Sequence, residues 1–484
     1  MRKWFLGLLA LVLAIGLVMP ALADVNISGS YRIRGTYYDY GGTSALGKVS
    51  EGMRQEARQH GISHDDAMTF WDNRLRLELS AKISDNLSFF VQADTGLGYD
   101  GSMYHNPLTH QDSYDGVFGN HWGGIEDGHA EVRGLYSYTI NNDTYYNDAK
   151  DIVFQRAYFT YIEPILGGEF KVGRQWTFWG KGLIKSMNEN RIQYVYRQPK
   201  FFVGVGFEKW EEGDILLDRD DLNEYSIFGS VELPLDIATI TYSPYFGARV
   251  YSGNGGDEYF ISNALKIVAL EKLIANVEFV YMWGHIRDDG IGYEEDADVD
   301  AYAVACDLSY DLDLAKVGLE FAYISGETPD NEKSGFHTSY WYSPFVIYGH
   351  LPIGPRLLAP DGVGYWPEEP THHELSNCYF FKLFASAEPI ENLEVSTAFG
   401  YIWAAVDRLD DSGNYIDGAD DIGFEWDVVV SYKITDNLHY HLEFGYLQVG
   451  DYYDVYNVPL ADGKIGKVEA SDAVALINAI QINF

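Results

Sequence analysis

The chain has 484 residues and a formal net charge of −38, with 72 acidic against 34 basic residues. This charge excludes a nucleic-acid-binding protein, because contacts to phosphates need a basic surface. The 38 tyrosines and 26 phenylalanines, against only 15 prolines, exclude a disordered chain. Two cysteines, Cys306 and Cys378, are too few for a disulfide framework, so we expect them to pack as small apolar side chains.

The first 23 residues have the pattern of a secretory signal peptide. Arg2 and Lys3 precede an apolar run, and Ala21-Leu22-Ala23 supplies the small residues of a cleavage site. Such a segment is removed on maturation, which would leave residues 24–484 as the mature chain. Beyond it no uncharged apolar run of about 18 residues occurs, so we expect no helix to span a membrane.

Apolar and polar residues then alternate in eighteen successive segments. In the first of them, Val25, Ile27, Tyr31 and Ile33 share one face, opposite polar residues such as Arg32. A period of two residues is the signature of a β-strand. The predicted strands are residues 25–39, 68–83, 87–98, 151–162, 168–177, 189–197, 200–209, 222–233, 236–251, 258–269, 274–287, 299–311, 314–326, 376–387, 392–407, 422–433, 437–449 and 470–484.

The connections between these segments alternate in length. Those after even-numbered strands are short, such as 84–86 and 234–235, whereas those after odd-numbered strands are mostly longer and acidic. Short turns at one rim and long loops at the other are expected of a bacterial outer-membrane barrel. We therefore predict a single all-β domain, a transmembrane antiparallel β-barrel of eighteen strands. Sixteen strands is the nearest alternative, because the pair between 189 and 209 is weakly marked.

Two strands break the alternation. Pro244 falls inside the segment 236–251, where it costs a hydrogen bond of the ladder unless a bulge absorbs it. In the segment 168–177, strict alternation would point Arg174 at lipid, so we predict a bulge at Gly173.

The final strand ends on an aromatic residue, Phe484. Ile482 and Leu476 lie on the same face, and Asn478 is the one polar residue there. This ending resembles the C-terminal signal of bacterial outer-membrane barrel proteins. We expect the last strand to close the barrel against residues 25–39, so that no strand edge meets lipid.

Residues 156–161 (RAYFTY), 167–175 (GGEFKVGRQ) and Trp179-Gly180 resemble a stretch found in proteobacterial outer-membrane porins. The similarity extends to the substrate-selective and alginate-export-type barrels, which have eighteen strands. The resemblance implies passive diffusion of small hydrophilic solutes or ions through a water-filled lumen, in the bacterial cell outer membrane. It implies contacts with outer-membrane lipid, lipopolysaccharide and the barrel assembly machinery, and it allows a homotrimer. The long acidic loops depart from the basic lumen of an alginate exporter, so the solute stays open.

Charged residues on the inward faces form two groups, a basic one in the early strands and an acidic one in the later strands. Even closure of eighteen strands would set Arg156 across from Glu320, and Arg74 across from Glu278. We predict a transverse field across the lumen that orients dipolar solutes. The alternative is that these charges pair with their neighbours and only solvate the wall. The predicted basic residues are Arg32, Arg34, Arg74, Arg76 and Arg156, and the acidic residues are Glu278, Glu320, Glu425, Asp427 and Glu443.

Loops narrow such pores, and three are candidates for doing so. Residues 100–150 and 326–375 are far longer than usual connections, which favours inward folding or capping. The shorter stretch 176–191 (WTFWGKGLIKSMNENR) contains two glycines that allow a sharp bend. We prefer this third loop as the constriction, carried by Trp176, Trp179, Lys181 and Lys185.

Motifs of catalysis are missing: there is no G-x-S-x-G, no H-E-x-x-H and no paired CxxC, so we predict no enzyme and no cofactor. His372-His373-Glu374 is a candidate metal cluster, although adjacent histidines on a loop are more often solvated. The acidic stretches 294–298 and 407–421 could hold calcium, but neither matches a twelve-residue calcium loop. Two other functions remain open: a barrel enzyme of lipase or protease type, and a plugged structural or adhesive barrel.

Overall fold

The computed structural model describes residues 24–39, 67–96, 136–140, 143–147, 152–211, 222–251, 256–286, 297–328, 334–339, 342, 344–348, 375–407, 419–460 and 462–484. No helix in these ranges is long and apolar enough to cross a membrane. Eighteen strands form one ring of antiparallel pairs: β1 (Asp24–Asp39), β2 (Ala67–Ser84), β3 (Leu87–Gly96), β6 (Ile152–Ile162), β7 (Glu169–Phe178), β8 (Ser186–Gln198), β9 (Phe201–Glu211), β10 (Leu222–Pro234), β11 (Ala238–Tyr251), β12 (Gly256–Ala269), β13 (Leu273–Ile286), β14 (Ala297–Asp311), β15 (Ala315–Ile324), β16 (Cys378–Ile390), β17 (Leu393–Ala404), β18 (Asp421–Thr435), β19 (Leu438–Val449) and β22 (Ala473–Asn483).

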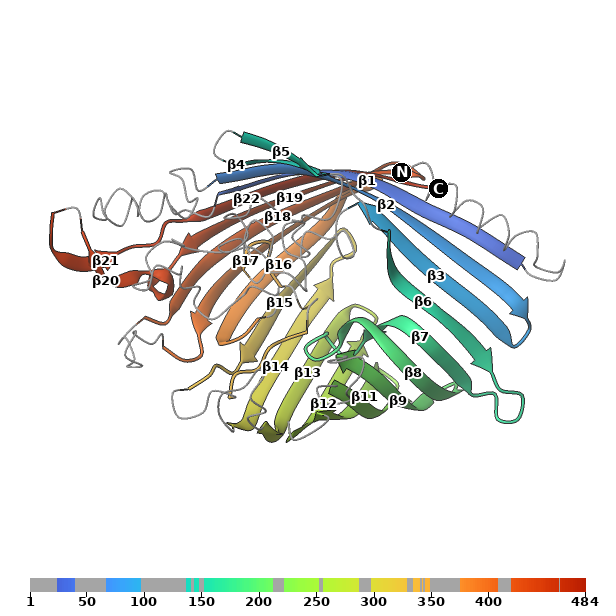
Figure 1. Cartoon of the computed structure of the whole chain (residues 1–484). Helices are drawn as coiled ribbons and strands as arrows, with labels where there is room; N and C mark the ends of the chain where they lie inside the picture. The colour runs from blue at the N-terminus through green and yellow to red at the C-terminus, as the bar shows by residue number, and fades with distance from the viewer. Residues whose placement is uncertain are drawn as a thin grey trace, which may run out of the picture.

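The ring is closed by β22, which pairs with β19 on one side and with β1 on the other. Figure 1 shows the strands following one another around the barrel, with the last strand, β22, beside the first, β1. The prediction of eighteen strands is confirmed. The alternative of sixteen is wrong, because the weakly marked segment folds as β8 and β9, paired from Asn190–Lys209 to Gln198–Phe201.

The seam between the first and last strands carries specific contacts. The backbone of Phe484 donates to the Gly29 carbonyl (2.9 Å) and accepts from the Gly29 N–H (2.8 Å). A Cβ on Gly29 would lie 2.8 Å from the Phe484 ring, so only glycine leaves room for it. Asn478, the one polar residue on the outer face of β22, donates from Nδ2 to the Gly35 carbonyl of β1 at 3.1 Å. Its polar side chain is therefore used to join the two strands.

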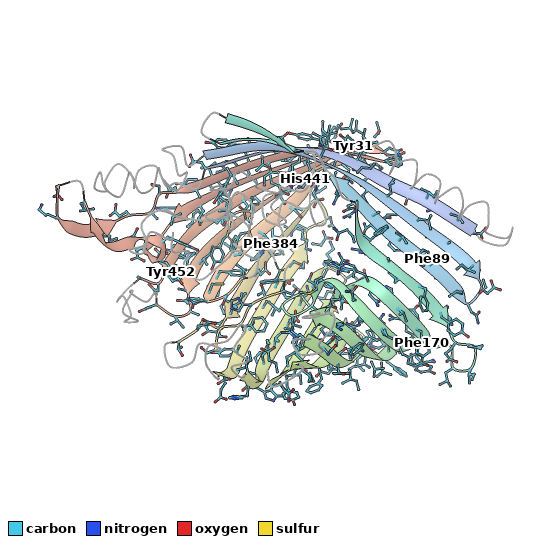
Figure 2. The ribbon with its side chains drawn as sticks, viewed as in Figure 1. Tyr31, Phe89, Phe170, Phe384, His441 and Tyr452 are labelled. Carbon is cyan, nitrogen blue, oxygen red and sulfur yellow. The ribbon has the colours of Figure 1, made fainter. Side chains whose placement is uncertain are left out.

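The polarity of the two faces of the sheet is the reverse of that in a soluble protein, with apolar side chains outside and polar side chains inside. On the outside, the rings of Tyr31, Phe89 and Phe170, labelled in Figure 2, are 36–40% exposed. On the inside, Arg34 and Glu278 are only 3% and 0% exposed. A soluble sandwich would bury the apolar face between its sheets. An apolar outer face and a polar inner face are the arrangement of a barrel in a membrane.

Two hairpins lie outside the ring and were not predicted from the sequence. β4 (Tyr136–Ile140) and β5 (Asp143–Asn147) continue the sheet beyond β2, since β4 pairs with residues 69–72. β20 (Val455–Pro459) and β21 (Ile465–Val468) form a separate two-stranded sheet between β19 and β22. Both hairpins project from the barrel in Figure 1.

The predicted bulge at Gly173 is wrong. Gly173 is paired with Tyr158 on one side and Arg191 on the other, without a shift in register. Its φ of 123° lies in the region that favours glycine, and a Cβ there would meet the Ala157 carbonyl oxygen at 2.2 Å. A register shift occurs instead in the neighbouring pair of strands, between β3 and β6, next to Gln92.

Phe484→Asp should lower the amount of folded barrel in the outer membrane severalfold, because it removes the ring that lies over Gly29 and places a charge on the lipid-facing side of the seam. Heat-modifiable migration of membrane extracts on gels measures the folded fraction. Asn483→Asp is the matched control, since Asn483 lines the inner cavity at the same strand end. Equal folded amounts of Phe484→Asp and the wild type would contradict the role of this seam.

Candidate functional site

The β7–β8 loop (residues 179–185) turns into the barrel and lies against the inner wall of β10–β15. Gly180 and Gly182 have φ values of 57° and 90°, which side chains rarely adopt. A Cβ on Gly180 would lie 2.5 Å from the carboxyl carbon of Glu278 on β13. Glycine therefore provides both the sharp bend and the close approach of the loop to the wall.

Trp179 fixes the first turn of this loop. Its ring packs edge-on against Phe228 and Tyr245, with centroids 5.7 and 5.3 Å away. Its Nε1 donates to the Ser243 carbonyl at 3.2 Å. Ser243 and the following Pro244 are not paired with β10 in the backbone ladder, which is interrupted there, as predicted for a proline inside a strand. The loop docks where the pairing of the wall is broken.

Lys181 connects the loop to two carboxylates of the wall. Its Nζ forms ion pairs with Asp307 on β14 and, at 3.2 Å, with Glu320 on β15. Burial alone would lower the pKa of Lys181, but Glu320 and Asp307 outweigh it and raise that pKa above the usual value. The lysine therefore stays charged and holds the loop across two strands.

Lys185 ends the loop inside a buried ionic cluster. Its Nζ lies 2.6 Å from Glu189, 2.5 Å from Glu208 and 2.9 Å from Glu224. Burial would lower the pKa of Lys185, but these three glutamates hold it well above the usual value. Arg191 also pairs with Glu208. The sequence indicated Lys185 but not its three glutamates, which come from β8, β9 and β10.

Glu278 on β13 accepts hydrogen bonds from the backbone of the loop. Its Oε2 receives the N–H of Lys181 at 2.7 Å and that of Leu183 at 3.1 Å. Its Oε1 receives the Ser262 hydroxyl at 2.8 Å. A carboxylate without exposed surface is stable only when such donors replace water.

A second inner segment comes from the connection between β15 and β16; its described residues are 334–339, 342 and 344–348. Ser339 joins it to the β7–β8 loop, donating from N to the Leu183 carbonyl (2.6 Å) and from Oγ to the Gly182 carbonyl (2.8 Å). Lys382 on β16 donates to the Pro344 carbonyl at 2.8 Å. The two inner segments are therefore hydrogen-bonded to each other and to the wall.

Residues 346–348 end the second inner segment against two carboxylates of β18. The N–H of Ile347 donates to Glu425 Oε1 at 2.5 Å, and that of Tyr348 donates to Glu425 Oε2 at 2.9 Å. The N–H of Val346 lies 3.3 Å from Asp427 Oδ2. Three consecutive backbone donors thus meet two acidic side chains on the same face of one strand.

Small inward residues make room for the second inner segment. Ala301, Ala303 and Ala305 occupy alternate positions of β14, and all three are at most 1% exposed. Together with the aromatic side chains of the segment they belong to one hydrophobic core within the barrel. The inward alanines were a sequence signal for a packed interior, which we missed because we read only charge on these faces. Rings of the segment in this core are Phe336, Tyr342, Phe345 and Tyr348.

The predicted basic residues lie on the other side of the lumen. Arg76 forms a bidentate pair with Asp94 on β3, at 2.8 and 2.7 Å. Arg156 donates to Asn188 at 3.1 Å and lies over the Trp176 ring, 5.4 Å from its centroid. Trp176 belongs to β7 and not to the loop. Arg156 therefore does not contact Glu320, although even closure would place the two residues opposite each other.

Arg32 and Arg34 line a cavity of about 1,020 Å³ at the end of the barrel that carries the short turns, such as the turn between β16 and β17. The cavity also contains His441, whose Nε2 lies 2.6 Å from Glu443 and whose Nδ1 lies 3.0 Å from the Ser431 hydroxyl. Figure 2 labels His441 on β19. The cavity wall mixes acidic and basic side chains, among them Glu394 and Lys433.

The acidic wall differs from the prediction. We expected five carboxylates that face open water across from the arginines. All point inward, but four are at most 8% exposed because the inner segments or their lysines cover them. Only Glu443 lines the cavity. The four covered residues are Glu278, Glu320, Glu425 and Asp427.

The remaining candidate sites lie outside the described residues. These are the signal peptide, the cluster His372-His373-Glu374, and most of the acidic stretches 294–298 and 407–421. Among described residues no group of three potential metal ligands comes together.

Ala303→Phe should lower the free energy of unfolding by about 1–3 kcal/mol, because the ring has no space between β14 and the second inner segment. Thermal denaturation in detergent measures the change. Ala275→Phe is the control, since Ala275 lies on the outer face beside Leu308 and its added ring would meet lipid. Similar melting temperatures for both variants would contradict the packed interior.

No family model and no curated protein matches the sequence. Solved structures match in fold. OccK9 (OpdG) of Pseudomonas aeruginosa has a TM-score of 0.50 and 10% identity, over 95% of this chain and 98% of that chain. The outer membrane protein OpdK and OccK8 (OprE) of the same organism each have a TM-score of 0.47 and 10% identity, over 95% of this chain and 99% and 98% of theirs. The chain therefore has the fold of the outer-membrane porins, a closed barrel of eighteen antiparallel strands.

Proposed function

We propose that the protein is an outer-membrane porin that lets small hydrophilic solutes or ions diffuse passively through its lumen. One observation carries this proposal: a closed barrel with an apolar outer face contains a cavity of about 1,020 Å³ lined by charged side chains, and the β7–β8 loop folds inward onto the barrel wall. A closed sheet with an apolar outer face is one of two structures that satisfy their backbone in a bilayer. A polar lumen inside such a barrel conducts unless it is filled.

The outer surface fits the environment of such a pore. Its apolar side chains would contact outer-membrane lipid, and the acidic loops at the far rim would lie near lipopolysaccharide. We include the barrel assembly machinery as a transient partner, and a homotrimer as one assembly that the fold allows. No nucleic acid, resident cofactor or catalysed reaction belongs to this proposal, and nothing among the described residues favours the barrel enzyme.

Selectivity at the narrow part would depend on the arginines. Because the inner segments cover Glu278, Glu320, Glu425 and Asp427, these carboxylates contribute little to the field in open water. Arg32 and Arg34 line the cavity directly. Arg34 is itself only 3% exposed, and Glu394 and Glu443 line the same cavity, so the transverse field that we predicted would be weak there.

The packed interior also supports a second candidate, a plugged structural barrel, since the inner segments fill one side of the lumen. Reconstitution in planar bilayers distinguishes the two. A porin gives discrete single-channel currents and a measurable cation-to-anion preference, and liposomes containing it swell in neutral sugars. A plugged barrel gives neither, and that outcome would overturn the porin.

Replacing Arg32 and Arg34 together by Gln should shift the reversal potential in a salt gradient toward cation preference, because two positive charges leave the lumen wall. The control carries Lys82→Gln and Lys272→Gln, which remove the same charge from exposed residues at the turn end of the barrel. An unchanged reversal potential in the arginine variant would show that these charges only solvate the wall.

A further inference from the structure

We propose that Glu278 and Glu425, with Asp427 beside Glu425, are positioning residues that set the bore of the pore. They do so by holding the backbone N–H groups of the two inner segments against the barrel wall. This inference rests on the proposed porin function. It assigns to these carboxylates a mechanical role in place of the electrostatic role that the sequence suggested.

The contacts of Glu278 are directed at backbone and not at a cation. Lys181 and Leu183 both donate their N–H groups to the same oxygen, Oε2, and the Ser262 hydroxyl binds the other oxygen. Hydrogen bonds from N–H groups to an ionised carboxylate are shorter and stronger than those between neutral groups. The absence of a Cβ at Gly180 lets the loop approach closely enough to make them.

Glu425 holds the second inner segment in a different way. Each of its two oxygens accepts one N–H group, from Ile347 and from Tyr348, and Asp427 extends the row to Val346. Successive N–H groups that point the same way form a concavity that binds anions. Here the anion belongs to the barrel wall, and the segment binds it.

The two anchors act on one unit because the segments are joined. Ser339 donates hydrogen bonds to the carbonyl groups of Gly182 and Leu183. Glu320 forms ion pairs with Lys181 of the loop and with Lys382. Lys382 in turn donates a hydrogen bond to the carbonyl of Pro344 in the second inner segment. Release of one segment should therefore loosen the other. The effects of removing Glu278 and Glu425 on conductance should be less than additive.

The two glutamates should respond differently to glutamine. Glu278→Gln keeps an oxygen for both loop N–H groups, and its amide can donate to the Ser262 hydroxyl. Glu425→Gln must place an NH₂ group against the N–H of Ile347 or Tyr348, because both oxygens of Glu425 are acceptors. A purely electrostatic role would make the two substitutions equivalent, since each replaces one carboxyl group by an uncharged amide.

The chain contains its own reporter of segment release. Cys378 on β16 has no exposed surface and lies in the same buried core as Tyr348 of the second inner segment. Once that segment leaves the wall, the thiol faces the lumen. Cys306, the other cysteine, lies on the outer face between Val277 and Phe321 and can be replaced by Ala so that only Cys378 is labelled.

The experiment compares Glu278→Ala, Glu278→Gln, Glu425→Ala and Glu425→Gln in a Cys306→Ala background, in planar bilayers and by labelling with a water-soluble maleimide. Glu232→Ala is the control, because Glu232 lies on the inner face of β10 but at the exposed turn end. We expect Glu425→Ala and Glu425→Gln to raise conductance at least about twofold, to admit larger polyethylene glycols and to expose Cys378. Glu278→Ala should raise conductance, whereas Glu278→Gln and Glu232→Ala should match the parent.

Parental conductance with a protected Cys378 in the folded Glu425 variants would overturn the inference. So would equal effects of Gln at the two positions. If the parent protein conducts no current, the porin proposal fails, but labelling of Cys378 in Glu425→Gln still reports whether the carboxylate holds the segment. Heat-modifiable migration confirms that each variant compared is folded.

Discussion

Satisfaction of backbone hydrogen bonds in a place without water is the constraint on which this structure depends. In hydrocarbon, an unpaired strand edge has no solvent to bond to, so β1 must pair with β2 on one side and β22 on the other. Closing eighteen strands creates a wide interior, and the same constraint then applies inside. The inner segments are irregular, and their N–H groups need acceptors once packing excludes water. The carboxylates of β13 and β18 supply them.

This constraint explains why charge on a barrel wall is a poor guide to the field in the lumen. A carboxylate that points inward contributes to the potential in the pore only while it faces water. When a segment covers it, its charge is compensated by N–H dipoles or by a lysine such as Lys181. Arg32 of β1, which is only partly buried and lines the cavity, therefore has a different role from the covered glutamates of β13 and β18, although all follow the same alternation in the sequence.

The strands of the barrel wall could be predicted from the sequence far better than the inner segments. All eighteen barrel strands were predicted within a few residues, because alternation over ten or more positions is a strong local signal. The inner segments are held by contacts such as that of Ser339 with Gly182, 157 positions apart, which no local pattern contains. The glycines of the β7–β8 loop predicted a bend, but not which wall residue the bend would meet. Hairpins β4–β5 and β20–β21 were hidden inside long connections.

The inward alanines of β14 have a consequence for how the barrel acquires its register. Over residues 301–306 this strand is apolar on both faces, with Ala301, Ala303 and Ala305 inside and Tyr302 and Val304 outside. A slip by one residue exchanges the two faces of a strand, and it costs little where both are apolar. The correct pairing of β14 must then be specified by the C-terminal part of the strand. There the two faces differ, because Asp307 and Ser309 point inward and Leu308 and Tyr310 point outward. The half of β14 that accommodates the inner segment depends on its other half for alignment.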